Sequence, residues 1–463
     1  MALNLKYTLK NIGNIDNAEV TIKPLTIIAG ENSSGKTFLT KSLYTILNSI
    51  YKDHFSDDLI KKFTRLNRSY KDFTDQPYEP SQIDHDFQSA YNAHSKKMSS
   101  VIQELSNAAF KDQNDILNAN EQIFDDFKTA IDEYLTHQEK TPHSSKYTEE
   151  INNIKESFAN LLHTIKNRMS TIVKGTQASL NIGFKKNYQI TNLHNLIKQD
   201  KKEDLEITID GIGTIKIDKQ AQIHFSFQGS GIEEIQSVKN IVFFDSPVYL
   251  KIRKALEKHN SGLLSFFNTK EEDSYLRGYP EYIEQIYAFM NKEYIHTPDF
   301  NEISQNIQET IAGKLDTTES GDIQYVDTKG SIIPISLTAM GISNLGLIDL
   351  LLRNNVINKG SFLIMDEPEV HLHPQWQVAL ANILYKIAQS GANIILATHS
   401  LDLLKAFQVK LQSDEEQASK IIAINKMPFD QEFSQRSEID KIGTILDDLS
   451  QPYYDLYMNK YGL

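Results

Sequence analysis

A glycine-rich stretch near the start of the chain has the residue types and spacing that hold phosphate groups. Gly30 to Thr37 read GENSSGKT, which fits the pattern G-x-x-x-x-G-K-[ST]. Glycines let backbone N–H groups turn toward phosphate oxygens, a lysine reaches the β and γ phosphates, and a threonine hydroxyl ligates Mg²⁺. We expect ATP and Mg²⁺ here, with Thr37 as a metal ligand. The residues expected to bind the nucleotide are Gly30, Asn32, Ser33, Ser34, Gly35, Lys36, Thr37 and Phe38.

A second stretch places two acids at the end of an apolar run. Phe362 to Met365 are apolar and are followed by Asp366 and Glu367. Such a run predicts a buried strand, and the carboxyl ends of parallel strands are where α/β sheets bind ligands. We expect Asp366 to hold Mg²⁺ and Glu367 to polarise the attacking water as general base.

A histidine follows a third apolar run. Asn393 to Ala397 precede Thr398-His399-Ser400, so His399 is expected at the same edge of the sheet, where it can sense the γ phosphate. Lys36, Glu367 and His399 are therefore the predicted catalytic set for ATP hydrolysis.

Two further clusters suit other chemistry. Glu369, His371 and His373 are residue types that bind zinc, but they follow Glu367 so closely that a turn at a subunit interface is the preferred interpretation. Residues 84–86 (Asp-His-Asp) offer paired acids, as metal-dependent nucleases do. No apolar strand presents them, so a solvated helix start is expected.

The elements around these residues indicate the fold class. Short strands are predicted between Leu5 and Ile28, followed by a helix from Thr37 to Tyr51. Toward the end of the chain, a helix from about Gly341 to Arg353 and another from about Pro374 to Gln389 alternate with the apolar strands. This order is typical of a parallel sheet. We expect an α/β fold, a P-loop ATPase head with a mixed or parallel sheet and a helical, hairpin-like insertion.

The composition changes between the two ends of the chain. Beyond Tyr51, Gly and Pro become scarce and apolar residues recur at helical intervals. The predicted domains are an N-terminal ATPase part (1–51), a helical insertion (52–203) and a C-terminal ATPase part (204–463). The insertion is expected to be two helices running out and back, with a turn near residues 141–143. It is either a solvated decoration or a docking arm, and without sustained heptads it is not a long coiled coil.

The overall composition limits the partners and the compartment. The formal net charge of −13 opposes a broad nucleic-acid-binding surface, although a local basic groove stays open. The chain has no cysteine, which excludes disulfides, thiolate zinc sites and cysteine nucleophiles. No secretory signal or apolar span is visible, so we expect a cytoplasmic protein without a membrane segment.

Together, AGENSSGKT, LIMDEPEVHLHP and ILATHS resemble the ATPase domain of the OLD, RecF and SMC-like branch of ABC ATPases. Within this branch, the chain is similar to the stand-alone AAA-type ATPases of bacterial antiphage systems, such as the AriA subunit of PARIS. The resemblance implies two ATP molecules sandwiched between two copies, each site completed by a signature segment of the partner. Ser336 to Gly341 match that segment, with Thr338, Ala339 and Gly341 as the contacts. The family's serine before the glycine appears here as Thr338 or Ala339.

The resemblance also implies partners. With a second copy, the chain would form a homodimer or a larger ring. This assembly would control a separate effector protein, such as a Toprim nuclease. A phage protein would be the trigger. Only 64 residues follow His399, too few for a Toprim domain. Two alternatives stay open: a RecF-type DNA-repair ATPase that clamps DNA, and a nucleotide-dependent scaffold with little turnover. The Q-loop of the family cannot be placed within the insertion.

Overall fold

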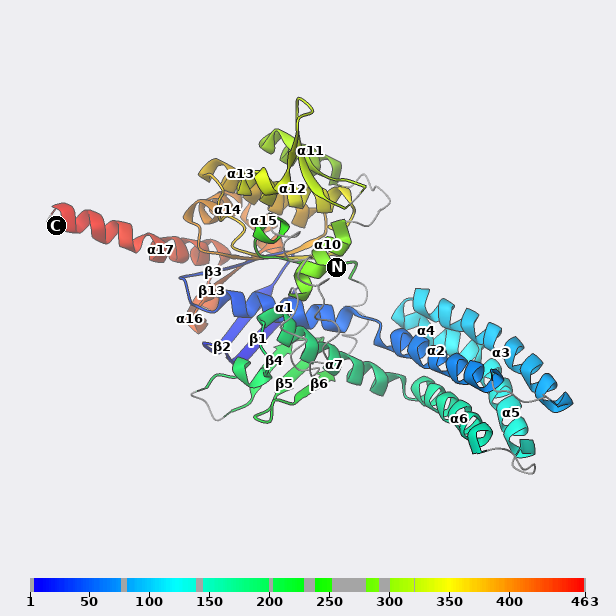
Figure 1. The fold of residues 1–463 in the computed structure, drawn as a ribbon. Coiled ribbons are helices and arrows are strands. Elements are labelled where there is room, and N and C mark those ends of the chain that lie inside the picture. Colours follow the sequence, from blue (N-terminus) through cyan, green and yellow to red (C-terminus); the bar gives the residue numbers. More distant parts are fainter. Residues whose placement is uncertain are drawn as a thin grey trace. The chain divides into compact units, whose positions relative to one another are not determined.

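The computed structural model describes residues 4–75, 81–138, 145–199, 203–228, 238–251, 280–290, 300–319 and 321–461 (Figure 1). The chain divides into two compact units. One contains Met1–Ser49 and Ser179–Leu463, and the other contains Ile50–Ala178.

A parallel sheet lies at the centre of the first unit. Its strands run in the order β13-β3-β12-β11-β7, and every neighbouring pair is parallel. Nearly all of their residues are buried, as expected for strands covered on both faces. The α/β fold class with a parallel sheet is therefore confirmed. The strands are β3 (Leu25–Gly30), β7 (Ile241–Phe244), β11 (Phe362–Asp366), β12 (Asn393–Thr398) and β13 (Ile422–Met427).

Helices of the same unit supply the apolar side chains that cover this sheet. Leu345, Leu384 and Phe407, from three of these helices, are fully buried and share one core with Ile394 of β12. The helices are α1 (Lys36–Tyr51), α10 (Glu281–Met290), α11 (Asn301–Ile311), α12 (Met340–Arg353), α13 (Pro374–Gln389), α14 (Leu401–Ser413), α15 (Glu415–Ile421), α16 (Gln431–Ser434) and α17 (Glu438–Tyr461).

Two antiparallel sheets complete this unit. The larger has the order β2-β1-β4-β5-β6 and the smaller the order β10-β9-β8. Burial alternates along β4 and β5, so the larger sheet has one face against the core. The strands and short 3₁₀ helices are β1 (Leu5–Ile12), β2 (Ile15–Ile22), β4 (Leu205–Ile209), β5 (Gly213–Ile217), β6 (Ile223–Phe227), β8 (Gly313–Thr317), β9 (Ile323–Asp327), β10 (Ile332–Pro334), η1 (Leu193–Leu196) and η5 (Ile335–Leu337).

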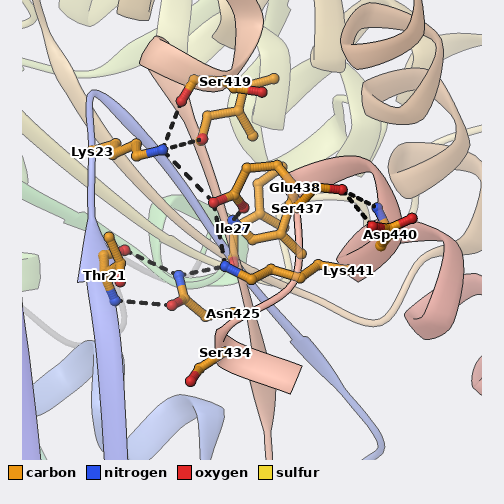
Figure 2. A network of polar contacts seen from close by, with 12 residues as sticks. Thr21, Lys23, Ile27, Ser419, Asn425, Ser434, Ser437, Glu438, Asp440 and Lys441 are labelled. Carbon is orange, nitrogen blue, oxygen red and sulfur yellow. Dashed lines mark hydrogen bonds and ion pairs between the residues drawn. The ribbon is translucent and has the colours of Figure 1, made fainter. Parts of the chain in front are cut away.

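A polar network joins the two larger sheets and the start of α17 (Figure 2). The side chain of Asn425 in β13 pairs with the backbone of Thr21 in β2: Oδ1 accepts from Thr21 N at 2.9 Å, and Nδ2 donates to Thr21 O at 3.1 Å. Glu438, the first residue of α17, accepts from Ile424 N at 2.6 Å and lies 3.7 Å from Lys23 Nζ. The network fixes the edge of the parallel sheet to its neighbours.

The second unit is helical. Its helices are α2 (His54–Thr74), α3 (Gln82–Asn107), α4 (Phe110–Ala119), α5 (Glu121–Gln138), α6 (Ser145–Lys166) and the first part of α7 (Arg168–Tyr188). The expectation of two helices running out and back is wrong. Shorter helices surround an aromatic core in which Phe87 stacks on Tyr134 at 3.9 Å and Tyr91 meets Phe127 at 5.1 Å. The predicted turn near residues 141–143 lies outside the described residues, and the predicted domain limits stay a prediction.

The acids of residues 84–86 mark a helix start, as the sequence predicts. Asp84 closes a capping box with Ser81, whose backbone N–H donates to Asp84 Oδ2 at 2.7 Å. The expectation of a solvated residue is wrong, because Asp84 is only 4% exposed and also accepts a hydrogen bond from Tyr134. No helix within the described ranges is long and apolar enough to cross a membrane.

Candidate active site

The register of the parallel sheet brings three sequence motifs to one edge. Ala29 of β3 pairs with Thr398 of β12, and Ala397 of β12 pairs with Asp366 of β11. The loop that begins at Gly30, the acids that end β11 and the histidine that follows β12 therefore lie on neighbouring strand ends. Strand order and register together create the site.

Lys36 begins α1 and is held by its own loop. Its ammonium donates to the carbonyl oxygens of Gly30 at 2.9 Å and Glu31 at 2.8 Å. The residue is only 5% exposed, and burial lowers the pKa of the amine, while the nearby carboxylates of Glu367 and Asp366 act in the opposite direction. A positive charge thus lies next to the acids of β11.

The loop between β3 and α1 is packed tightly at its start. A Cβ on Gly30 would lie 2.0 Å from the carbonyl oxygen of Met427 in β13, so only glycine fits there. Farther along, Asn14 donates to the carbonyl of Ser33, and the buried Ser34 Oγ has no hydrogen-bond partner. An unpartnered hydroxyl in this loop suits a phosphate oxygen.

The other predicted loop residues differ in exposure. Asn32 and Thr37 are exposed, whereas Gly35 is buried. Phe38 is half-buried, and its ring lies 5.5 Å from the ring of Tyr188. Its side chain therefore packs within the fold, which leaves only its backbone N–H for a phosphate.

Asp366 is a buried acid at the end of β11. It is 8% exposed, and its Oδ1 has no hydrogen-bond partner. Burial raises the pKa of this carboxyl to about 6, with a smaller contribution from Asp245, while the hydroxyl of Thr37 opposes the rise. A buried, unpartnered carboxylate oxygen beside a threonine hydroxyl is a donor set that suits Mg²⁺.

Glu367 and His399 face each other across β11 and β12. Glu367 Oε1 lies 3.0 Å from His399 Nδ1, and both side chains are about one third exposed, at 35% and 39%. The backbone of Glu367 has a φ of 51°, in the left-handed region. The buried Glu369 completes this arrangement, since its Oε1 accepts from His399 N at 3.2 Å and from Thr398 Oγ1 at 2.5 Å. Burial raises the pKa of the Glu369 carboxyl.

A cavity of about 390 Å³ opens beside these groups. Its lining carries hydroxyl, ammonium, carboxylate and amide groups from Thr37, Lys41, Asp245, Asn344, Asp366 and Glu367. This donor set, with the unpartnered oxygen of Asp366, fits a nucleotide phosphate with its Mg²⁺.

Among the residues that line this cavity, sequence reasoning missed Lys41, Asp245 and Asn344, whose side chains carry an ammonium, a carboxylate and an amide. Asp245 directly follows β7, the neighbour of β11, so the rule that singled out Asp366 applies to it as well. Lys41 lies one helical turn beyond Thr37, and its Nζ is 3.7 Å from Asp245. Asn344 gave no signal in the sequence.

The predicted signature segment lies at the start of α12 and does not line the cavity. Thr338 is 5% exposed, and its hydroxyl donates to the carbonyl of Pro334 at 3.0 Å. Ala339 is exposed, while Gly341 is buried so closely that a Cβ would lie 3.1 Å from the carbonyl oxygen of His371. The Thr338 hydroxyl is therefore used within its own turn.

The cluster of Glu369, His371 and His373 is not a metal site in the structure. His373 is the N-cap of α13, where its Nδ1 accepts from Gln375 N at 3.3 Å. Among the residues that the structure describes, no group of three or more His, Asp or Glu side chains is arranged to hold a metal. The cluster forms the turn between β11 and α13, and Glu369 points to His399.

The parallel sheet and the phosphate-binding loop define a P-loop nucleotide-binding protein of the α/β class. The chain belongs to the AAA ATPase domain family, whose model matches residues 5–404. A comparison with curated proteins found no match.

Among solved structures, the chain is similar to SMC head domains. With the Pyrococcus furiosus SMC head bound to the C-terminal domain of ScpA it shares 12% identity at a TM-score of 0.37, covering 88% of this chain and 92% of that one. With the Thermotoga maritima SMC head it shares 10% identity at a TM-score of 0.35, covering 87% and 92%.

Proposed function

We propose that this protein is a cytoplasmic ABC-type ATPase that binds ATP with Mg²⁺ at the edge of the parallel sheet and hydrolyses it. The observation that carries this proposal is that Asp366 and Glu367 line one polar cavity, while His399 contacts Glu367 and the Lys36 ammonium interacts with both acids. Each group has the chemistry that phosphoryl transfer to water requires.

Each residue has a defined role in this proposal. Lys36 would leave the carbonyls of its loop and bind the β and γ phosphates, while Thr37 and Asp366 would hold Mg²⁺, which neutralises charge on the phosphates when bound. Glu367 would accept the proton of the attacking water. His399 would hold the Glu367 carboxylate in place and contact the γ phosphate.

Pairing of two copies would complete each site. Leu337, in the signature segment, is 77% exposed, and Val370, in the turn after Glu367, is 40% exposed. A second copy would cover these apolar side chains. Because α12 has no side-chain cap, the backbone N–H groups at Ala339 and Gly341 can serve the partner's γ phosphate, in place of the Thr338 hydroxyl.

We further propose that the ATPase controls a separate effector, such as a Toprim nuclease, in antiphage defence, with a phage protein as the trigger. This part rests on the resemblance of the motifs AGENSSGKT, LIMDEPEVHLHP and ILATHS to the ATPases of such systems. Co-expression with any Toprim-type nuclease that the neighbouring genes encode, followed by purification with and without ATP, tests it. A nuclease that never co-purifies would contradict this part alone.

The ATPase itself is tested by the mass of the protein in solution and by phosphate release, with ATP and Mg²⁺. We expect the wild type and Glu367→Gln to form dimers or larger rings, with turnover only in the wild type. Lys36→Ala should neither bind ATP nor assemble. If all three stay monomeric and bind no ATP, the proposed function is wrong. ATP-dependent assembly with negligible wild-type turnover would instead favour a nucleotide-dependent scaffold.

A further inference from the structure

Asn344, in the second turn of α12, is a buried polar residue for which the roles above give no function. It is 3% exposed, and its neighbours on the helix, Leu345 and Leu347, are buried apolar residues. A buried amide costs free energy unless its polar atoms are bound. Packing alone would be served by an apolar side chain here.

The amide nitrogen of Asn344 holds the turn that follows β11. Nδ2 donates to the carbonyl oxygens of Pro368 at 3.2 Å and Val370 at 3.1 Å, on either side of Glu369. The turn contains two non-glycine residues in the left-handed region, Glu367 with a φ of 51° and His371 with a φ of 69°. Such conformations cost energy and persist where surrounding contacts fix them. The amide supplies two of these contacts.

The amide oxygen of Asn344, unlike the amide nitrogen, lacks a hydrogen-bond partner. Oδ1 is buried, and the residue lines the same cavity as Asp366, whose Oδ1 is also unpartnered. Both atoms accept hydrogen bonds and neither donates. A water molecule, free or in the hydration shell of a cation, supplies the donors that two such acceptors require.

We propose that Asn344 is a positioning residue of this site: its nitrogen fixes the turn that carries Glu367, and its oxygen accepts a hydrogen bond from a cavity water shared with Asp366. This inference rests on the proposed ATPase function. It gives α12 a role within its own chain, because the side chain of Asn344 joins this helix to the turn that carries the general base.

Two substitutions distinguish the role of the Asn344 amide nitrogen from that of its amide oxygen. Asn344→Asp keeps the size and an acceptor but loses the donor, whereas Asn344→Leu loses both. Asn354 provides the control, since it is the C-cap residue at the other end of α12 and its side-chain amide donates to the carbonyl of Met290 at 3.2 Å. The full chain is used throughout, with kcat and KM for ATP, the affinity for a fluorescent ADP with and without Mg²⁺, and the thermal midpoint.

We expect both Asn344 variants to lower kcat by at least about tenfold, because the turn of Glu367 loses its anchor. Without Mg²⁺, their affinity for ADP should stay within about threefold of the wild type. The increase in affinity that Mg²⁺ gives should persist in Asn344→Asp and shrink in Asn344→Leu. Asn354→Leu should lower only the thermal midpoint.

Wild-type kcat in either Asn344 variant would overturn the inference while the ATPase function stands. The same holds if the Asn344 variants only lose thermal stability, as the Asn354 control does. If Asn344→Leu does not fold, kcat of the size-matched Asn344→Asp decides. A wild type that neither binds nor hydrolyses ATP would instead remove the proposed function, and this inference with it.

Discussion

His399 Nδ1 lies 3.0 Å from Glu367 Oε1, although 31 residues separate the two positions along the chain. The two residues follow adjacent parallel strands whose register pairs Asp366 with Ala397. A histidine that binds one oxygen of a carboxylate fixes its orientation and leaves the other oxygen for a water molecule. The register of the two strands and the contact between the side chains therefore fix Glu367 and His399 relative to each other.

Replacing His399 with alanine should reduce turnover more than binding. Without the imidazole, the Glu367 carboxylate loses its partner, and we expect kcat to fall by about 10²-fold or more. The affinity for ADP should change little, since Lys36 and the loop are untouched. Steady-state phosphate release and ADP titration measure the two effects.

His373→Ala is the matched control for this prediction. It removes an exposed histidine that caps α13, which should cost about 1 kcal/mol of stability and leave kcat unchanged. Equal losses of kcat in the two variants would contradict the pairing of His399 with Glu367.

Gly30→Ala should disrupt the phosphate-binding loop. The added Cβ would lie 2.0 Å from the Met427 carbonyl oxygen, so β3 and β13 must separate or the loop must move. We expect a loss of stability of about 1–3 kcal/mol and weaker ATP binding. Gly211→Ala, at a turn with a φ of 77° and nothing near its Cβ, isolates the cost of backbone strain alone. If Gly30→Ala lowers the free energy of unfolding by no more than Gly211→Ala does, the close approach of Gly30 to the Met427 carbonyl does not require a glycine.

Asp366→Asn should stabilise the nucleotide-free protein while it abolishes the effect of Mg²⁺. The carboxyl has a pKa of about 6 in the fold against an ordinary 3.8, mainly because of burial. The folded chain thus holds this proton more tightly than the unfolded chain. The free energy of unfolding therefore falls as pH rises from about 4 to about 6, at a cost of about 3 kcal/mol above that range.

The thermal midpoint of Asp366→Asn should exceed that of the wild type at pH 7, and the difference should vanish near pH 4, where the wild-type acid is neutral. In the wild type, Mg²⁺ should strengthen ADP binding above about pH 6 and lose this effect below it. If the difference in thermal midpoint between Asp366→Asn and the wild type does not depend on pH, then titration of the Asp366 carboxyl does not cause that difference.

The sequence predicts those parts of the fold that depend on local patterns. The strands that end at Gly30, Asp366 and Thr398 are short apolar runs, and the predicted helix from Pro374 to Gln389, which begins with proline, coincides with α13. Because parallel strands end at a common edge, the meeting of the three motifs follows from the same patterns.

The missed features depend on contacts between distant segments. The contribution of Asp245 requires that β7 lie beside β11, where Phe244 pairs with Met365, and nothing in either segment specifies this pairing. Asn344 binds backbone carbonyl groups of another segment. Every residue type has such a group, so the sequence does not indicate this contact. In the helical unit, the spacing predicts helices but not how aromatic side chains such as Phe87 and Tyr134 pair.

Asn425→Leu should destabilise the first unit, because this side chain connects two sheets. The substitution removes both hydrogen bonds to Thr21 and leaves that residue's N–H and carbonyl without these partners, in a position where Asn425 is 8% exposed. An unsatisfied buried group costs about 1–3 kcal/mol, so urea unfolding should show a decrease in this range. Asn17→Leu, on an exposed position of β2, should change the free energy of unfolding by less than about 0.5 kcal/mol. Equal effects of the two substitutions would mean that the joint between β2 and β13 does not depend on this amide.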